Sequence, residues 1–201
     1  DMALTFAEQY DVQVICLDEP GLWAPDLRQK NIKVHCLWRQ PGFDPNVVLR
    51  LALILTESKV ELLHAHQCTP WFYGALSRVL NRRPRLLLEE HGRFHPEVRK
   101  PTRIGFNRLL LGRLTDAVVA VSADIRERLV TYEGLARDRI RVIYNGTRPS
   151  EDMTPDERSS LRLELGYGSN DFVIGTVGRL DPIKNLPLLL RAFSALRKKY
   201  G

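Results

Sequence analysis

Features of disulfide-bonded, membrane-spanning and secreted proteins are scarce in this chain of 201 residues. Its three cysteines, Cys16, Cys36 and Cys68, have the spacing of neither a disulfide framework nor a metal site. No run approaches the roughly 20 apolar residues that a membrane-spanning helix needs. The first ten residues, DMALTFAEQY, lack the basic start and apolar stretch of a signal peptide. We therefore expect reduced, buried thiols and a cytoplasmic protein.

Several familiar catalytic motifs are also missing. The sequence contains no serine nucleophile elbow, no Walker loop and no dinucleotide-binding G-x-G-x-x-G pattern. No residue stands out as a general base. A mechanism built on any of these elements is therefore disfavoured.

Acidic residues are outnumbered, with 24 Asp and Glu against 30 Lys and Arg, which gives a formal net charge of +6. Much of the excess lies at residues 78–113, where only three glutamates accompany ten basic residues: Arg78, Arg82, Arg83, Arg85, Arg93, Arg99, Lys100, Arg103, Arg108 and Arg113. Such a cluster could meet the phosphates of a membrane surface or of a lipid-linked acceptor, or it could form solvated helix faces. Nucleic acid is disfavoured, because no nucleic-acid motif is present and aromatic residues do not interleave with the basic ones.

Apolar runs of strand length alternate with helical patterns along residues 2–144. Strands are expected at 12–17, 32–37, 60–64, 86–90, 117–121 and 140–144, and helices at 2–10, 26–29, 45–58, 70–80, 104–114 and 122–130. Continuous apolar strands separated by helices are typical of a parallel sheet covered on both faces. We therefore predict an α/β fold with a Rossmann-like, doubly wound parallel sheet, whose ligands bind at the carboxyl ends of the strands.

The alternation stops after residue 146, where the polar, proline-bearing segment TRPSEDMTPDERSS begins. A helix is expected at 155–165, followed by a strand at 172–177 and a helix that opens at Asn185. We place an N-terminal domain that lacks its first strand at residues 1–149. Residues 150–201 are interpreted as a linker and the start of a second, truncated domain. One strand and one helix cannot bury their own apolar faces, so we expect the chain to be a fragment.

The loop after residues 172–177 has the composition of an anion site. Gly178 ends the apolar run, Arg179 and Lys184 follow five residues apart, and a helix is expected from Asn185. Backbone N–H groups and the helix dipole favour negative charge, and the two cations neutralise it. This combination predicts a bound diphosphate, and a surface turn with two solvated cations is the alternative.

The loop sequence GRLDPIKN resembles the G-R-L-x-x-x-K-[GN] motif of family 4 glycosyltransferases, which are retaining enzymes with the GT-B fold. Three further segments resemble that family in the same order. They are VELLHAHQCTP at 60–70, LLLEEHGRF at 86–94, and DAVVAVSADIRERL at 116–129 with RIRVIYNG at 139–146. The resemblance departs at Thr147 and Arg148, because family members usually carry Asp one or two places after the glycine. The family's glycine-rich loop and E-x7-E motif have no counterpart in these residues.

The resemblance implies roles for the basic loop and for one histidine. Arg179 and Lys184 would hold the diphosphate of a nucleotide-sugar donor, and Gly178 would let the backbone approach it. His91 would contact the donor sugar near the reacting carbon. Because these enzymes mainly stabilise charge on the leaving diphosphate, we expect neither a metal nor another cofactor.

Three other residues are pocket or metal candidates. His66 and Asn145 follow strands that end near the expected cleft, so both are candidate acceptor or pocket residues. His64 and His66 alternate onto one strand face, a spacing that could suit a metal. No third ligand stands nearby in the sequence, so we expect no metal site.

The predicted function is transfer of a hexose from a nucleotide diphosphate sugar to an acceptor hydroxyl, with retention. The acceptor would be a glycan or a lipid-linked molecule in cell-surface polysaccharide or glycolipid biosynthesis. The enzyme would be cytoplasmic, with peripheral association at the inner face of the membrane. The alternatives are a GT-B epimerase or phosphorylase and a non-catalytic phosphate-binding module. We expect this chain alone to be inactive, because the cleft needs both domains.

Overall fold

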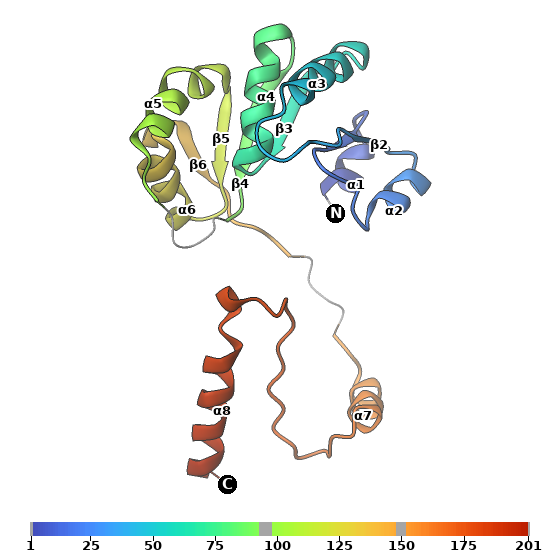
Figure 1. Cartoon of the computed structure of the whole chain (residues 1–201). Coiled ribbons are helices and arrows are strands. Elements are labelled where there is room, and N and C mark those ends of the chain that lie inside the picture. The colour runs from blue at the N-terminus through green and yellow to red at the C-terminus, as the bar shows by residue number, and fades with distance from the viewer. Residues whose placement is uncertain (1, 93–97, 148–151, 201) are drawn as a thin grey trace. The chain divides into compact units, whose positions relative to one another are not determined.

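The computed structural model describes residues 2–92, 98–147 and 152–200 (Figure 1). The chain divides into two compact units, Asp1–Asn145 and Gly146–Gly201, each of which is described by itself. Among the described residues, no helix combines the length and the apolar character that crossing a membrane requires.

The first unit is built on a four-stranded parallel sheet. Its strands are β3 (Leu62–His66), β4 (Arg85–Glu90), β5 (Ala117–Ala120) and β6 (Ile140–Val142), in the order β3-β4-β5-β6. The connections contain α4 (Cys68–Leu80), α5 (Pro101–Leu109), η1 (Leu111–Leu114), α6 (Ala123–Arg128), η2 (Leu129–Glu133) and η3 (Arg137–Arg139). The predicted α/β class with a parallel sheet is confirmed.

Two further strands form a separate parallel pair. The N-terminal elements are α1 (Met2–Ala7), β1 (Gln13–Cys16), α2 (Ala24–Gln29), β2 (Lys33–Cys36) and α3 (Pro45–Glu57). Among the described strands β1 pairs only with β2, so the strands make two sheets rather than one. A hydrophobic cluster joins β1 to β3 instead: Ile15 and Leu63 both pack against a cluster that includes Leu51 and Leu55 of α3. Strands form ladders only when they lie about 4.8 Å apart, whereas side chains bridge wider separations.

One face of β4 packs into the main core. Leu86 and Leu88 are fully buried against Trp71 of α4, together with Val118 and Ala120 of β5. Successive side chains of a strand point to opposite faces. Glu89 therefore faces away from this core.

The second unit contains α7 (Pro155–Glu164), η4 (Pro182–Lys184) and α8 (Leu186–Tyr200). Thr154 caps α7, because its hydroxyl accepts from the Glu157 N–H while the Glu157 carboxylate accepts from the Thr154 N–H. The strand expected at 172–177 is wrong, since these residues form no ladder. A strand exists only with a partner to take up its N–H and C=O groups, and no other described segment of this unit supplies one.

Candidate functional site

The carboxyl ends of β3 and β4 bring three histidines and one glutamate together. The parallel register pairs His66 with Glu89. Because side chains on one strand face recur every second residue, His64 joins His66 and His91 follows Glu89. The two adjacent strands therefore present an H-x-H sequence beside an E-x-H sequence. We call these four residues the strand-end cluster.

Short distances connect the strand-end cluster. His66 Nδ1 lies 2.9 Å from His91 Nε2 in a hydrogen bond, and the two rings stack with centroids 5.2 Å apart. Glu89 Oε2 lies 2.7 Å from His64 Nε2 and 3.9 Å from His66 Nδ1. Glu89 Oε1 lies 3.6 Å from His91 Nε2. The carboxylate therefore borders all three imidazoles.

The environment of His66 favours a neutral ring. Burial lowers the pKa of His66, and the neighbouring His64 adds to this effect, while Glu89 opposes it. In a hydrogen bond between two imidazoles, one nitrogen donates and the other accepts. A neutral His66 therefore fits its bond to His91.

The structure adds a third candidate ligand that the sequence order did not reveal. The sequence showed no third ligand near His64 and His66, yet Glu89 lies beside both of them. Glu89 is distant in sequence but adjacent through the parallel register. The signal that could have located it is a pair of carboxylates, Glu89 and Glu90, at the end of an otherwise apolar strand.

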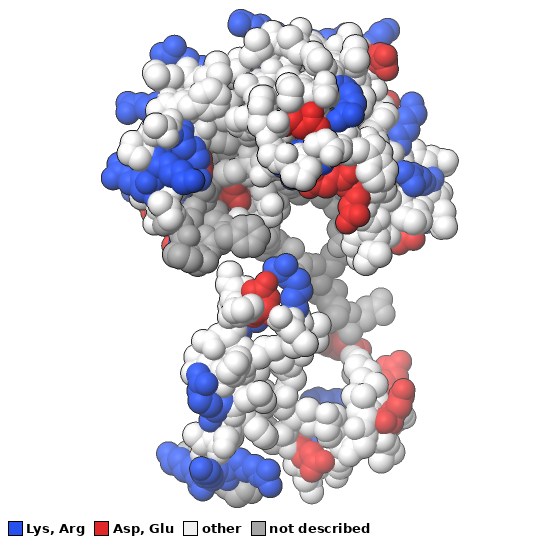
Figure 2. All heavy atoms as spheres, viewed as in Figure 1, with Lys and Arg blue, Asp and Glu red and all other residues white. Residues whose placement is uncertain are grey.

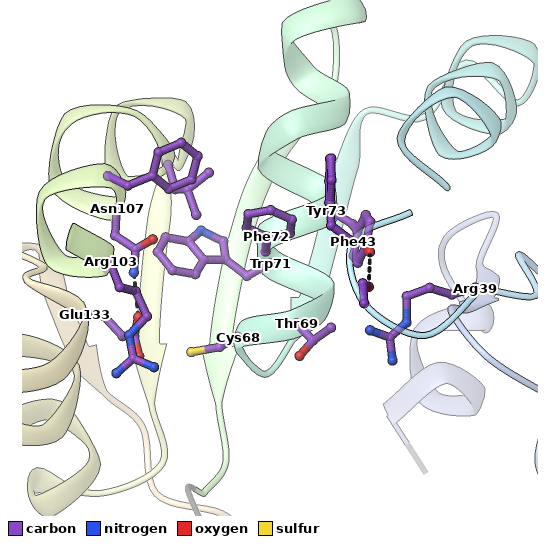
Figure 3. A pocket seen from close by; sticks show the side chains of 13 residues that line it. Arg39, Phe43, Cys68, Thr69, Trp71, Phe72, Tyr73, Arg103, Asn107 and Glu133 are labelled. Carbon is purple, nitrogen blue, oxygen red and sulfur yellow. Dashed lines mark hydrogen bonds and ion pairs between the residues drawn. The ribbon is translucent and has the colours of Figure 1, made fainter. Parts of the chain in front are cut away.

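A pocket of about 360 Å³ opens beside α4 (Figure 3). Its wall is aromatic: Phe43 packs edge-on against Phe72 with centroids 5.7 Å apart and stacks on Tyr73 at 6.2 Å. The Arg39 guanidinium lies over the Tyr73 ring, 5.9 Å from its centroid, and is also paired with Asp18 at 2.7 Å. Sequence reasoning missed this pocket, because Phe43 and Arg39 lie about 30 residues before the aromatic run at 71–73 that they meet.

The other side of the pocket is polar and partly buried. Glu133 is 2% exposed, accepts a 2.5 Å hydrogen bond from Asn107 Nδ2 and lies 3.5 Å from Arg103 Nη2. It ends η2, a single π-helical segment. Such segments recur at functional sites, and here the segment places a carboxylate on the pocket wall.

The remaining predicted site residues lie elsewhere. Asn145 follows β6, is exposed, and makes no hydrogen bond or ion pair with another described residue. In the second unit, Arg179 and Lys184 are exposed and make no ion pair with another described residue. A side chain added at Gly178 would meet no atom within 4 Å. The roles assigned to these residues stay predictions.

The positions of the histidines at strand ends agree with a match to a known family. The model of Glycosyltransferase Family 4 matches residues 1–151. The chain belongs to that family. Among curated proteins, the D-inositol 3-phosphate glycosyltransferase of Nocardia farcinica is 34% identical over 87 residues, which make up 42% of this chain and 18% of that protein. An uncharacterised glycosyltransferase of Methanocaldococcus jannaschii is 28% identical over 87 residues, or 42% of this chain and 22% of that protein.

Two solved structures share this fold. The Anabaena protein Alr3699/HepE, solved in complex with UDP, matches with a TM-score of 0.76 and 25% identity over 96% of this chain and 52% of its own. A glycosyltransferase from Rickettsia africae matches with a TM-score of 0.60 and 20% identity, over 78% of this chain and 42% of its own. This chain thus spans about half the length of these solved relatives.

Proposed function

We propose that this family 4 chain is part of a retaining glycosyltransferase that moves a sugar from a nucleotide diphosphate donor to an acceptor hydroxyl. The observation that carries the proposal is the meeting of His66 and His91 at the carboxyl ends of two parallel strands. Ligands of doubly wound folds bind at that edge of the sheet. The Anabaena structures, one with UDP and one with UDP and glucose, support a nucleotide sugar as the donor.

In this proposal Arg179 and Lys184 bind the donor diphosphate, assisted by backbone amides near Gly178. Both cations are exposed and free of ion pairs with other described residues, so their charges are available to a ligand. Negative charge grows on the leaving phosphate in the transition state, and nearby cations stabilise it. His91 contacts the donor sugar near the reacting carbon. We assign no metal or other cofactor to the transfer step.

We infer that the aromatic pocket beside α4 receives the acceptor. Cys68 and Thr69 line this pocket, and they come just after β3, the strand that carries His66. Aromatic rings supply large apolar contact surfaces, which suit the faces of a sugar or cyclitol ring. Each guanidinium has five N–H donors, so Arg39 and Arg103 retain donors for an anionic group beyond their carboxylate partners. The name of the Nocardia relative supports a phosphorylated polyol, which is neither a glycan nor lipid-linked and so adds a third candidate to the two expected acceptor classes.

The strand order supports the proposal that the chain is a fragment. Among the described strands, β1 and β3 each have one edge without a partner. In the common doubly wound order 3-2-1-4-5-6, one more parallel strand lies between the second and the fourth. A strand supplied by a preceding segment would join β1 to β3 and complete a single sheet.

We also propose a cytoplasmic enzyme of polysaccharide or glycolipid biosynthesis that associates with the inner face of the membrane. Lys and Arg side chains gather on the surface where α5 and α6 lie (Figure 2). Such a surface attracts anionic headgroups. Binding to anionic vesicles is the measurement that tests this association.

Loss of the Arg179 guanidinium tests the donor site. In the full-length protein, Arg179→Ala should lower turnover of a UDP-sugar by roughly tenfold to a thousandfold, because a charge-assisted contact to the leaving phosphate is lost. The assay is release of UDP with an acceptor present. Arg197→Ala, which removes another exposed arginine of the second unit, is the matched control and should leave turnover unchanged. Equal turnover in the two variants would remove the diphosphate-binding role of Arg179.

A further inference from the structure

The strand-end cluster contains more ligand atoms than the proposed transfer reaction uses. One ligand atom from each of His64, His66 and Glu89 lies within 4.8 Å of the other two. Glu89 Oε2 is 2.7 Å from His64 Nε2 and 3.9 Å from His66 Nδ1. The backbone holds them there, because His64 and His66 share one face of β3 and Glu89 is the register partner of His66. The three side chains therefore lie together on one face of the sheet.

The contact between His64 and Glu89 is unusual for a hydrogen-bonded pair. Among the described residues the buried His64 Nε2 has no hydrogen-bond partner, although Glu89 Oε2 is only 2.7 Å away. The distance alone would permit a hydrogen bond, so it is the angle at which the imidazole and the carboxylate meet that is unsuitable. A buried polar atom without a partner is costly and needs an explanation. A cation bound between the two electron-pair donors would satisfy both of them.

We propose that His64 Nε2, His66 Nδ1 and the Glu89 carboxylate bind a divalent transition-metal ion of the Zn²⁺ type. Two imidazoles and one carboxylate form a ligand set typical of Zn²⁺, whereas Mg²⁺ and Ca²⁺ prefer oxygen ligands throughout. One carboxylate charge and two neutral rings leave a bound divalent ion only partly neutralised. That leaves the site able to take a further ligand.

The distances suit such an ion after small movements. Bonds of about 2.0–2.1 Å in a tetrahedron place neighbouring ligand atoms roughly 3.3–3.4 Å apart. The two Glu89 oxygen–imidazole distances of 2.7 Å and 3.9 Å lie on either side of that value. Side-chain rotations are enough to equalise them, because the backbone register is already in place.

Access and a fourth ligand are also available. The His66 side chain is 46% exposed, so an ion can enter from solvent, while the Glu89 side chain is only 11% exposed and is shielded. Three protein ligands leave one position open in a tetrahedral zinc site. Water can fill it. The ion would take the place of the hydrogen bond between His66 Nδ1 and His91 Nε2, which lie 2.9 Å apart.

Calorimetric titration of metal-free protein with Zn²⁺ tests the site without any activity assay. We expect one ion per chain, and binding at least about tenfold weaker in His64→Gln, His66→Gln and Glu89→Gln, since loss of a ligand should cost no less than loss of a residue that supports one. His35→Gln is the matched control, because His35 lies on β2 and its Nε2 bonds Gln13 Oε1 at 3.0 Å. Its affinity should equal that of the unsubstituted protein.

Two outcomes of the titration overturn the proposal: no stoichiometric Zn²⁺ binding to the unsubstituted chain, or unchanged affinity in the double variant His64→Gln/His66→Gln. The visible spectrum of Co²⁺ bound to unsubstituted protein provides a test that does not depend on how the variants fold. Strong absorption of tetrahedral Co²⁺ supports the site. Weak absorption of the octahedral ion, or no bound Co²⁺, contradicts it.

Discussion

At the scale of the residue, the neighbouring carboxylates Glu89 and Glu90 at the end of β4 make different contacts. Glu89 borders the histidines, whereas Glu90 points to the opposite face and is 1% exposed. Glu90 accepts from the Cys68 thiol at 3.0 Å and from the Gly92 N–H at 3.3 Å. The second bond ties Gly92, the residue after His91, to β4, so Glu90 helps to hold the turn in which His91 lies.

Thr115 is the buried residue whose substitution should be most informative for stability. Its hydroxyl accepts from Trp71 Nε1 and donates to the Leu111 carbonyl, both at 2.7 Å. Thr115→Val keeps the shape but leaves the buried indole N–H unpaired, so the free energy of unfolding should fall by about 1–3 kcal/mol. Urea denaturation measures the change. Thr115→Ser keeps the hydroxyl, so its free energy of unfolding should fall by less. A valine variant as stable as the unsubstituted protein would contradict this account.

At the scale of the element, α4 links the two sheets of the first unit. Trp71 belongs to the core of the four-stranded sheet, while Tyr73 belongs to the cluster that holds Leu37 and α3. The Tyr73 hydroxyl also accepts from the backbone N–H of Asp44, the residue that caps α3. The cap of α3 and the packing of α4 are therefore coupled.

The cap of α3 should make stability depend on acidic pH. Backbone N–H groups of Gln40 and then Asn46 donate to the Asp44 carboxylate and hold its pKa below the ordinary value of about 3.9. A lowered folded-state pKa means that the carboxylate stabilises the fold above pH 4 and that this contribution is lost as pH falls through the lowered pKa. We expect Asp44→Asn to lower the unfolding free energy at pH 7 and the difference from the unsubstituted protein to shrink below pH 4.

Urea denaturation between pH 3 and pH 7 measures this effect. Asp11→Asn is the control, because Asp11 is exposed and makes no hydrogen bond with another described residue. The free energy of unfolding of Asp11→Asn should not differ from that of the unsubstituted protein by an amount that disappears at acidic pH. A difference for Asp44→Asn that stays constant over the whole range would mean that the charge of the cap is unimportant.

At the scale of the whole molecule, the net charge of +6 is unevenly distributed. Arg99, Lys100 and Arg108 are exposed at or beside α5. Arg103 differs from them, because it forms an ion pair with Glu133. Exposed basic residues add about 1 kcal/mol each to binding of an anionic surface. Charge reversal at the three exposed positions should therefore weaken binding to phosphatidylserine-containing vesicles at least tenfold.

Cosedimentation with those vesicles measures the binding. Reversal of Arg197, Lys198 and Lys199 near the end of α8 changes the net charge by the same amount and is the matched control. If both triple variants lose binding equally, the attraction follows from net charge alone and the surface at α5 has no special role.

Element positions were largely predictable because local patterns decide them. The helix predicted at 45–58 is Pro45–Glu57, and the strand predicted at 86–90 is Arg85–Glu90. Alternation of such elements was enough for the parallel α/β class. The strand predicted at 172–177 failed for the opposite reason, since pairing depends on a partner that residue pattern cannot guarantee.

The sequence by itself determined the fold class, the family resemblance and the candidate residues His66 and His91, because short motifs and apolar periodicity are local properties. Only the tertiary structure decided that Glu89 lies between the histidines and that Phe43, Phe72 and Arg39 border one pocket. Parallel register and helix packing bring these residues together across long stretches of chain. Those distances are set by the fold as a whole, so no local pattern records them.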